Sequence, residues 1–130
     1  QEFNGNISNW DTSGVTDMPG MFSGAKMFNQ NLETSGNKWN VSKVTSMAYM
    51  FYDASGFNQN LASWDVSGIT DANNSTNFAT NAGFNACNKK KIYNSWIVEK
   101  DISVGNWSNI DGSSIRDWSG ANIDLLCDDT

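Results

Sequence analysis

Hydrophobic and polar positions recur along this chain in the same order three times. Each unit opens on a phenylalanine, at Phe3, Phe28 and Phe57, and a fragment of a fourth unit opens at Phe84. An aliphatic residue, a tryptophan, a second aliphatic residue and a stretch ending in Phe follow in order, separated by Asn, Asp, Ser, Thr and Gly. That last stretch is rich in Met in the first two units, whereas the third has Ala72 in place of the methionine. Intervals of 25 to 29 residues are typical of repeat proteins, in which each unit buries its apolar side by stacking on a neighbour.

The spacing within a unit predicts its secondary structure. The short and flat residues of segment 59–64 predict a brief strand that pairs in parallel with the same segment of the next unit. Met18, Met21 and Phe22 then lie at helical spacing, with Thr16 as the N-cap and Pro19 tolerated in the first turn. Each unit should therefore be a short strand, a turn and a short helix, which makes the fold an α/β solenoid.

The chain changes character after the third unit. Residues 87–98 place Ile92, Tyr93, Trp96 and Ile97 on one stripe and predict the longest helix, lying across the end of the repeats. The preceding Lys89–Lys91 run should be a solvated face of that helix. Gly, Ser and Asn punctuate the remainder like turns. The expected organisation is a three-repeat solenoid over 1–86 and a helical and irregular cap over 87–130, together one structural domain.

Composition and charge exclude several classes of function. The formal net charge is −6, which disfavours binding to nucleic acid or to an anionic membrane. No apolar stretch approaches the length that spans a bilayer. The chain has no histidine, so Ser-His-Asp, Cys-His and His-metal chemistry are absent. We expect no cofactor and no metal site.

The two cysteines, Cys87 and Cys127, bracket the non-repetitive segment. Their placement predicts a disulfide that closes the cap, and two unlinked buried thiols are the alternative. A disulfide would indicate an oxidising, extracellular setting. The start of the chain at the edge of a repeat suggests a fragment of a longer array.

The phrases FNQNLASWDVSGITD and VTDMPGMFSGA carry a resemblance to a known family. Residues 2–86 resemble the repeat of BspA-like bacterial surface proteins, a leucine-rich-repeat relative that is common in mycoplasmas, gut and marine bacteria and some protists. The resemblance implies a right-handed, leucine-rich-repeat-like solenoid. It also implies a place in secreted or surface-anchored proteins that act as adhesins on host matrix proteins or other cells. The family has no shared catalytic residues to transfer.

Candidate binding residues lie where the repeat is interrupted and along one aromatic column. The second unit contains an insertion at 33–38, just before Trp39, and insertions in repeats often map to the binding face. Glu33, Asn37 and Lys38 are its candidate residues. The tryptophan column either points inward as core or outward as a strip for sugars or proteins, and the small number of aliphatic residues favours the inward alternative. Its members are Trp10, Trp39 and Trp64.

Two sets of polar residues recur at the repeat period. The asparagines Asn4, Asn29 and Asn58 should form a ladder of side chains along the stack. The aspartates Asp11 and Asp65 share a column and could form a glycosidase pair. Recurrence at the repeat period favours a structural role in turns or caps instead.

These observations predict an extracellular or cell-surface recognition module, an adhesin without catalytic activity. Its partner would be a protein or glycan on a host or neighbouring cell, bound through the repeat surface. One alternative is an architectural spacer or tip domain within a larger surface or fibre protein. A second is a carbohydrate-active enzyme that uses the paired aspartates. The sequence leaves the oligomeric state open.

Overall fold

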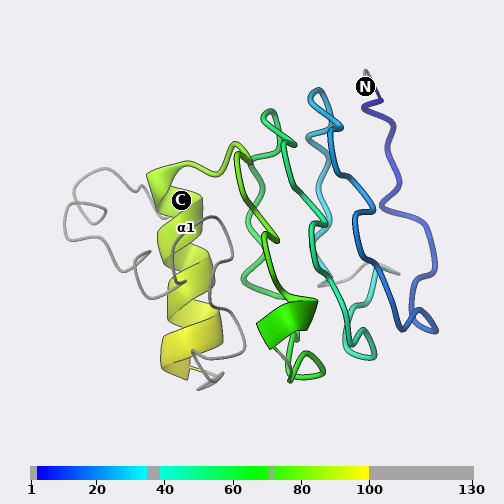
Figure 1. The fold of residues 1–130 in the computed structure, drawn as a ribbon, viewed down its shortest axis with the longest axis vertical. Coiled ribbons are helices and arrows are strands. Elements are labelled where there is room, and N and C mark those ends of the chain that lie inside the picture. The colour runs from blue at the N-terminus through cyan, green and yellow to red at the C-terminus, as the bar shows by residue number, and fades with distance from the viewer. Residues whose placement is uncertain (1–2, 35–38, 71, 100–130) are drawn as a thin grey trace.

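The computed structural model describes residues 3–34, 39–70 and 72–99. Its helical elements are the 3-10 helix η1 (Ala72–Asn74), the α-helix α1 (Ala86–Tyr93) and the π-helix η2 (Asn94–Glu99). The three repeats lie side by side in sequence order, with α1 next to the third (Figure 1). None of the helices in these residues is long and apolar enough to cross a membrane.

The predicted α/β leucine-rich-repeat-like solenoid is wrong. Across the three described ranges there is no strand and no sheet, and a single isolated parallel bridge joins Asp17 to Ser46. The predicted strand over 59–64 contains a tight turn, in which the Trp64 N–H donates to the Leu61 carbonyl at 3.0 Å. The predicted helix around Met18 and Phe22 is a pair of turns. The repeats stack, but they do so without strands or repeated helices.

Two consecutive turns replace the predicted helix of the first repeat. The N–H of Met21 donates to the Met18 carbonyl, and that of Ala25 donates to the Phe22 carbonyl. Gly20 and Gly24, each the third residue of its turn, have φ of 64° and 74°, which is typical of type II turns. Pro19 is at the second position, where proline favours a type II turn. The Pro-Gly pair therefore starts a turn here and does not continue a helix.

The same turn pair recurs in the later repeats. The equivalent bonds join Met50 to Met47 and Ala54 to Phe51, then Phe78 to Ser75 and Ala82 to Ala79. Every third turn position again has positive φ, at Tyr49, Asp53, Asn77 and Asn81. The backbone conformation is thus repeated even where glycine is not.

Alternate N–H groups of the turn pair bond to the next repeat. From the first repeat, the N–H groups of Met18, Gly20, Phe22 and Gly24 donate to the carbonyls of Ser46, Ala48, Met50 and Tyr52 at 2.7–2.9 Å. From the second, those of Met47, Tyr49, Phe51 and Asp53 donate to Asn74, Thr76, Phe78 and Thr80 at 2.8–3.0 Å. In an α-helix, each N–H beyond the first turn bonds to the carbonyl four residues earlier in the same segment. Division of the donors between turns and the neighbouring repeat excludes that helix.

The predicted ladder Asn4, Asn29 and Asn58 is present and continues to Asn85. Each Oδ1 accepts the backbone N–H of the next member, at 2.8–2.9 Å. The ladder ends at Asn85, whose Oδ1 instead accepts the N–H of Asn88 and caps α1. A residue of the repeat ladder is therefore also the N-cap of the helix.

Aromatic rings fill the core along the stack. Phe3, Phe28 and Phe57 stack with centroids 5.7–5.8 Å apart, and Phe84 meets Phe57 edge to face at 5.5 Å. Phe22 and Phe51 form a second column beside the first, 4.2 Å from Phe28 and 4.1 Å from Phe57. These pairs contribute beyond the area that they bury. They also fix the register in which one repeat covers the next.

The predicted helix over 87–98 is confirmed as α1 followed by η2. It packs against the third repeat, since Ile92 and Trp96 are fully buried and the Trp96 ring lies 6.2 Å from that of Phe78. The indole N–H of Trp96 donates to the Leu61 carbonyl at 3.2 Å. The helix thus covers the apolar end that the third repeat would otherwise leave exposed.

Candidate binding site

The predicted tryptophan strip is divided between core and surface. Trp39 and Trp64 are fully buried, whereas Trp10 is 50% exposed. The Trp64 indole N–H donates to the Leu32 carbonyl at 2.8 Å, but the buried Trp39 Nε1 has no hydrogen-bond partner among the described residues. The inward alternative therefore describes two of the three rings, and a ligand at the surface can reach only Trp10.

Trp10 belongs to the uncovered end of the first repeat. A hollow of about 330 Å³ there is lined by Phe3, Trp10, Met21, Phe22, Ser23 and Ala25. Phe3 is 45% and Met21 39% exposed. The hollow is where a preceding repeat would stack, which explains its apolar lining.

The insertion leads to a more polar hollow. Glu33 lines an open groove of about 430 Å³ at the junction of the second repeat, the third repeat and the helical segment. The other lining residues are Asn60, Ala62, Ser63, Lys91, Asn94 and Ser95. We call this hollow the junction groove. Asn37 and Lys38, the other predicted insertion residues, lie outside the described residues.

Local hydrogen bonds explain how the groove is built. The Asn31 Oδ1 accepts the Glu33 N–H at 2.8 Å, and the Asn60 Oδ1 accepts the Ala62 N–H at 2.9 Å. Such Asx turns fix the two walls that come from the repeats. On the helical side, the Ser95 hydroxyl donates to the Ala62 carbonyl at 2.6 Å. The groove is therefore held by bonds between repeat and helix.

The groove presents hydrogen-bond donors to solvent. Within the described part of the chain, the Lys91 ammonium, the Asn94 side-chain amide and the Asn60 Nδ2 have no hydrogen-bond partner. Glu33 is also among the lining residues. Opposite charges and free amides in one hollow suit a polar ligand with both acceptors and a positive group. The sequence placed Lys91 on a solvated helix face. It gave no sign that Lys91 lies near the insertion, because the two are distant in sequence and come together only in the folded chain.

The candidate carboxylate pair occupies turns. The Asp11 Oδ1 accepts the N–H and the hydroxyl of Ser13, at 3.1 and 2.7 Å, and Asp65 makes the same two bonds with Ser67. Asn40 makes the corresponding backbone bond to Ser42 in the second repeat. This column thus shapes turns, as its recurrence indicated. Among the described residues, no group of three or more acidic, Cys or His side chains is placed to hold a metal ion.

Cys87 lies in the first turn of α1 and is disulfide-bonded. Its predicted partner, Cys127, lies outside the described residues, so the Cys87–Cys127 pairing stays a prediction.

Comparison with known proteins identifies one family. A family model described as "Mycoplasma protein of unknown function, DUF285" matches residues 1–96. No curated protein and no solved structure matches the chain. The matched residues include the three repeats and α1, so every lining residue of the junction groove falls within them.

Proposed function

The chain belongs to the DUF285 family of Mycoplasma proteins, and we propose that it is an extracellular, non-catalytic recognition module that binds a protein ligand in the junction groove. The observation that carries the proposal is the meeting of Glu33, from the insertion, with Lys91 and Asn94, from the helical segment, around one open hollow. These residues come from separate parts of the sequence, and the stack supplies the rigid frame that holds them.

The chemistry of the groove favours a protein segment over a glycan. None of the described residues that line it is aromatic, so they offer no ring for a sugar to stack on. A groove lined by both Glu33 and Lys91 suits a peptide that carries charges of both signs. The bonded oxygens of Asp11 and Asp65 support a role without catalysis.

The disulfide at Cys87 supports the extracellular part of the proposal. Disulfides form and persist mainly in oxidising compartments, and Cys87 is disulfide-bonded. A place on the cell surface would bring the groove to host or neighbouring-cell proteins, as expected of an adhesin.

A binding screen with matched variants tests this function. We expect the intact chain to bind at least one member of an array of purified matrix and cell-surface proteins. Lys91→Glu should weaken that binding about tenfold, because it reverses the charge of the free donor. Lys43→Glu, the same change at an exposed position outside the groove, should leave binding unchanged.

Two results would contradict the proposal. Equal binding by the Lys91→Glu and native chains would show that the groove is not the site. A blank array of proteins, with or without binding to glycans, would favour the spacer or a different recognition role.

A further inference from the structure

Tyr49 is an unusual residue for its position in the repeated turns. The third position of the first turn is Gly20, Tyr49 and Asn77 in successive repeats, with φ of 64°, 60° and 53°. Glycine adopts this conformation freely and asparagine tolerates it, but for a bulky side chain it is unfavourable. Tyr49 is therefore an unfavourable choice for the turn itself.

Backbone hydrogen bonds hold Tyr49 in this conformation, because its N–H donates to the Thr76 carbonyl and its own carbonyl accepts the Tyr52 N–H, but its side chain is not part of the core. The Tyr49 side chain is 45% exposed, and its ring contacts a single other ring, that of Tyr52, among the described residues. Neither phenol hydroxyl has a hydrogen-bond partner there. The two ring centroids are 5.5 Å apart with planes at 58°. The strained tyrosine thus forms an exposed aromatic corner and no part of the core. Backbone strain of this kind gathers at functional sites.

Polar groups adjoin the corner on one side and open space adjoins it on the other. Asp53, at the equivalent position of the next turn, accepts the Asn81 Nδ2 on Oδ1 at 2.8 Å, and its other oxygen has no partner among the described residues. On the side of the first repeat, a Cβ built on Gly20 would meet nothing within 4 Å. Rings, a carboxylate oxygen and an amide therefore share one accessible edge.

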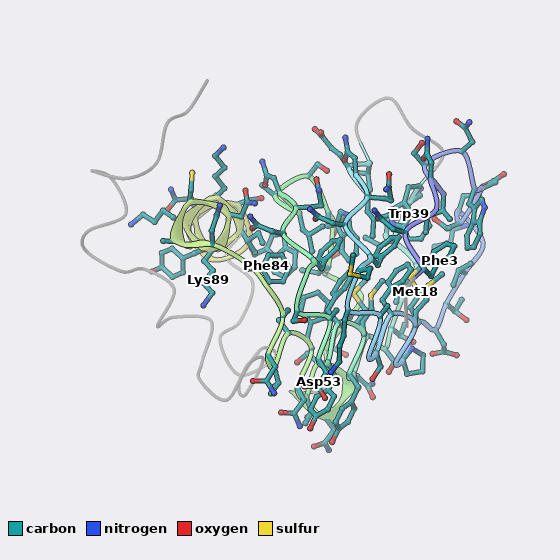
Figure 2. The ribbon with its side chains drawn as sticks, turned by 90° about the horizontal axis from the view of Figure 1, so that it is seen from above. Phe3, Met18, Trp39, Asp53, Phe84 and Lys89 are labelled. Carbon is teal, nitrogen blue, oxygen red and sulfur yellow. The ribbon has the colours of Figure 1, made fainter. Side chains whose placement is uncertain are left out.

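This edge is separate from the junction groove. None of its four residues, Tyr49, Tyr52, Asp53 and Asn81, lines that groove. Figure 2 shows Asp53 at the edge of the molecule, far from Lys89 of α1. A ligand at this edge would be additional to the one proposed above.

We propose that Tyr49 and Tyr52 form a shelf that binds a neutral pyranose sugar. The apolar C–H face of the sugar ring stacks on a tyrosine ring. Its hydroxyls donate to the free oxygen of Asp53 and to the amide oxygen of Asn81, and the exposed phenol hydroxyls supply further bonds. Aromatic grooves also bind proline-rich peptides. Such a peptide offers few N–H donors for the Asp53 carboxylate, whereas a sugar offers several hydroxyls, so the acceptors here favour the sugar.

A test on the intact chain uses an array of neutral oligosaccharides of glucose, galactose, mannose and N-acetylglucosamine, followed by titration of the best binder. Tyr49→Asn installs the residue that the third repeat has at this position. We expect it to weaken sugar binding about tenfold while the melting temperature stays equal or rises, because strain is relieved. Met27→Ser, at a 58% exposed apolar residue away from the shelf, should change neither quantity.

The two readouts separate a binding role from a structural one. Loss of sugar binding with an equal or higher melting temperature supports the shelf. A lower melting temperature in Tyr49→Asn would assign the tyrosine to the fold and overturn the proposal. Unchanged sugar binding in Tyr49→Asn, or no binding of any array member by the native chain, would overturn it as well. Lys91→Glu, the variant of the junction groove, should retain sugar binding, so failure of one site does not mimic failure of the other.

Discussion

The first and second repeats place similar residues in the same columns but bury them to different degrees. Phe28 is fully buried where Phe3 is 45% exposed, and Trp39 is fully buried where Trp10 is 50% exposed. The second repeat has a described repeat on each side, whereas the first has one on a single side. In this protein, a large apolar residue is buried when a neighbouring repeat covers it. The residue type alone does not determine burial.

The column that holds Met27, Gly56 and Gly83 shows the same contrast, because here contact between repeats excludes a side chain. Gly56 and Gly83 follow Met27 at the repeat interval, and a Cβ at either glycine would meet a backbone carbonyl of the preceding repeat, that of Lys26 or Ser55. Met27, in the first described repeat, is 58% exposed. Where the backbones of neighbouring repeats are in contact, the position must be glycine, because any other side chain would clash.

Truncation of equivalent phenylalanines should give the largest test of this contrast. We expect Phe57→Ala to lower the free energy of unfolding by about 3–5 kcal/mol, because a buried ring leaves a cavity. Phe3→Ala should lower it by about 1 kcal/mol, since that ring stacks on one face only. Urea unfolding of both variants measures the difference. Equal losses would mean that the first repeat is as well covered as the third.

The glycine column gives a test of intermediate size. Gly56→Ala should lower the free energy of unfolding by about 1–3 kcal/mol, because the added methyl group must displace the Lys26 carbonyl. Met27→Ala, at the equivalent exposed position, should change it by about 0.5 kcal/mol or less. Thermal unfolding followed by tryptophan fluorescence compares the two. A neutral Gly56→Ala would disprove the close approach of the backbones.

The buried tryptophans give the smallest and finest comparison. Trp64→Phe removes the donor to the Leu32 carbonyl, whereas Trp39→Phe removes an indole N–H that has no partner. Both variants lose similar ring volume, so we expect Trp64→Phe to be less stable by about 1 kcal/mol, the contribution of one hydrogen bond. Unfolding in urea at matched protein concentration gives the difference. The reverse order would indicate that Trp39 gains more from its indole than Trp64 does.

Stacking of the repeats could be predicted from the sequence. Phenylalanine and asparagine recur at the repeat period because each contacts its equivalent in the neighbouring repeat. The ladder from Asn4 and the helix around Ile92 follow from such patterns. The local conformation could not be predicted by apolar spacing alone. Met18, Met21 and Phe22 fit a helix, but Pro19-Gly20 is a turn signal that outweighs them. Two turns in succession place the same side chains on one face without helical bonds.

The sites were accessible to sequence reasoning in part. Glu33 could be singled out because an insertion breaks the repeat, but its proximity to Lys91 depends on how α1 packs on the third repeat. Tyr49 carried a signal that spacing does not show. A tyrosine in a column that otherwise holds glycine and asparagine stands out only once the column is known to be the third position of a turn.

The hydrogen bonds that the turn pairs make between repeats all have the same direction, so the two ends of the stack are chemically different. Turn-pair N–H groups point from each repeat toward the next, so the carbonyls of Asp17, Pro19, Met21 and Ser23 receive no hydrogen bond from any described residue. Two copies facing each other through their first repeats would set acceptors against acceptors. A segment that prolongs the stack at this end by the same turn-pair bonds must present an N–H at every second residue, whereas the asparagine ladder requires the opposite direction, since there each N–H donates to the preceding repeat.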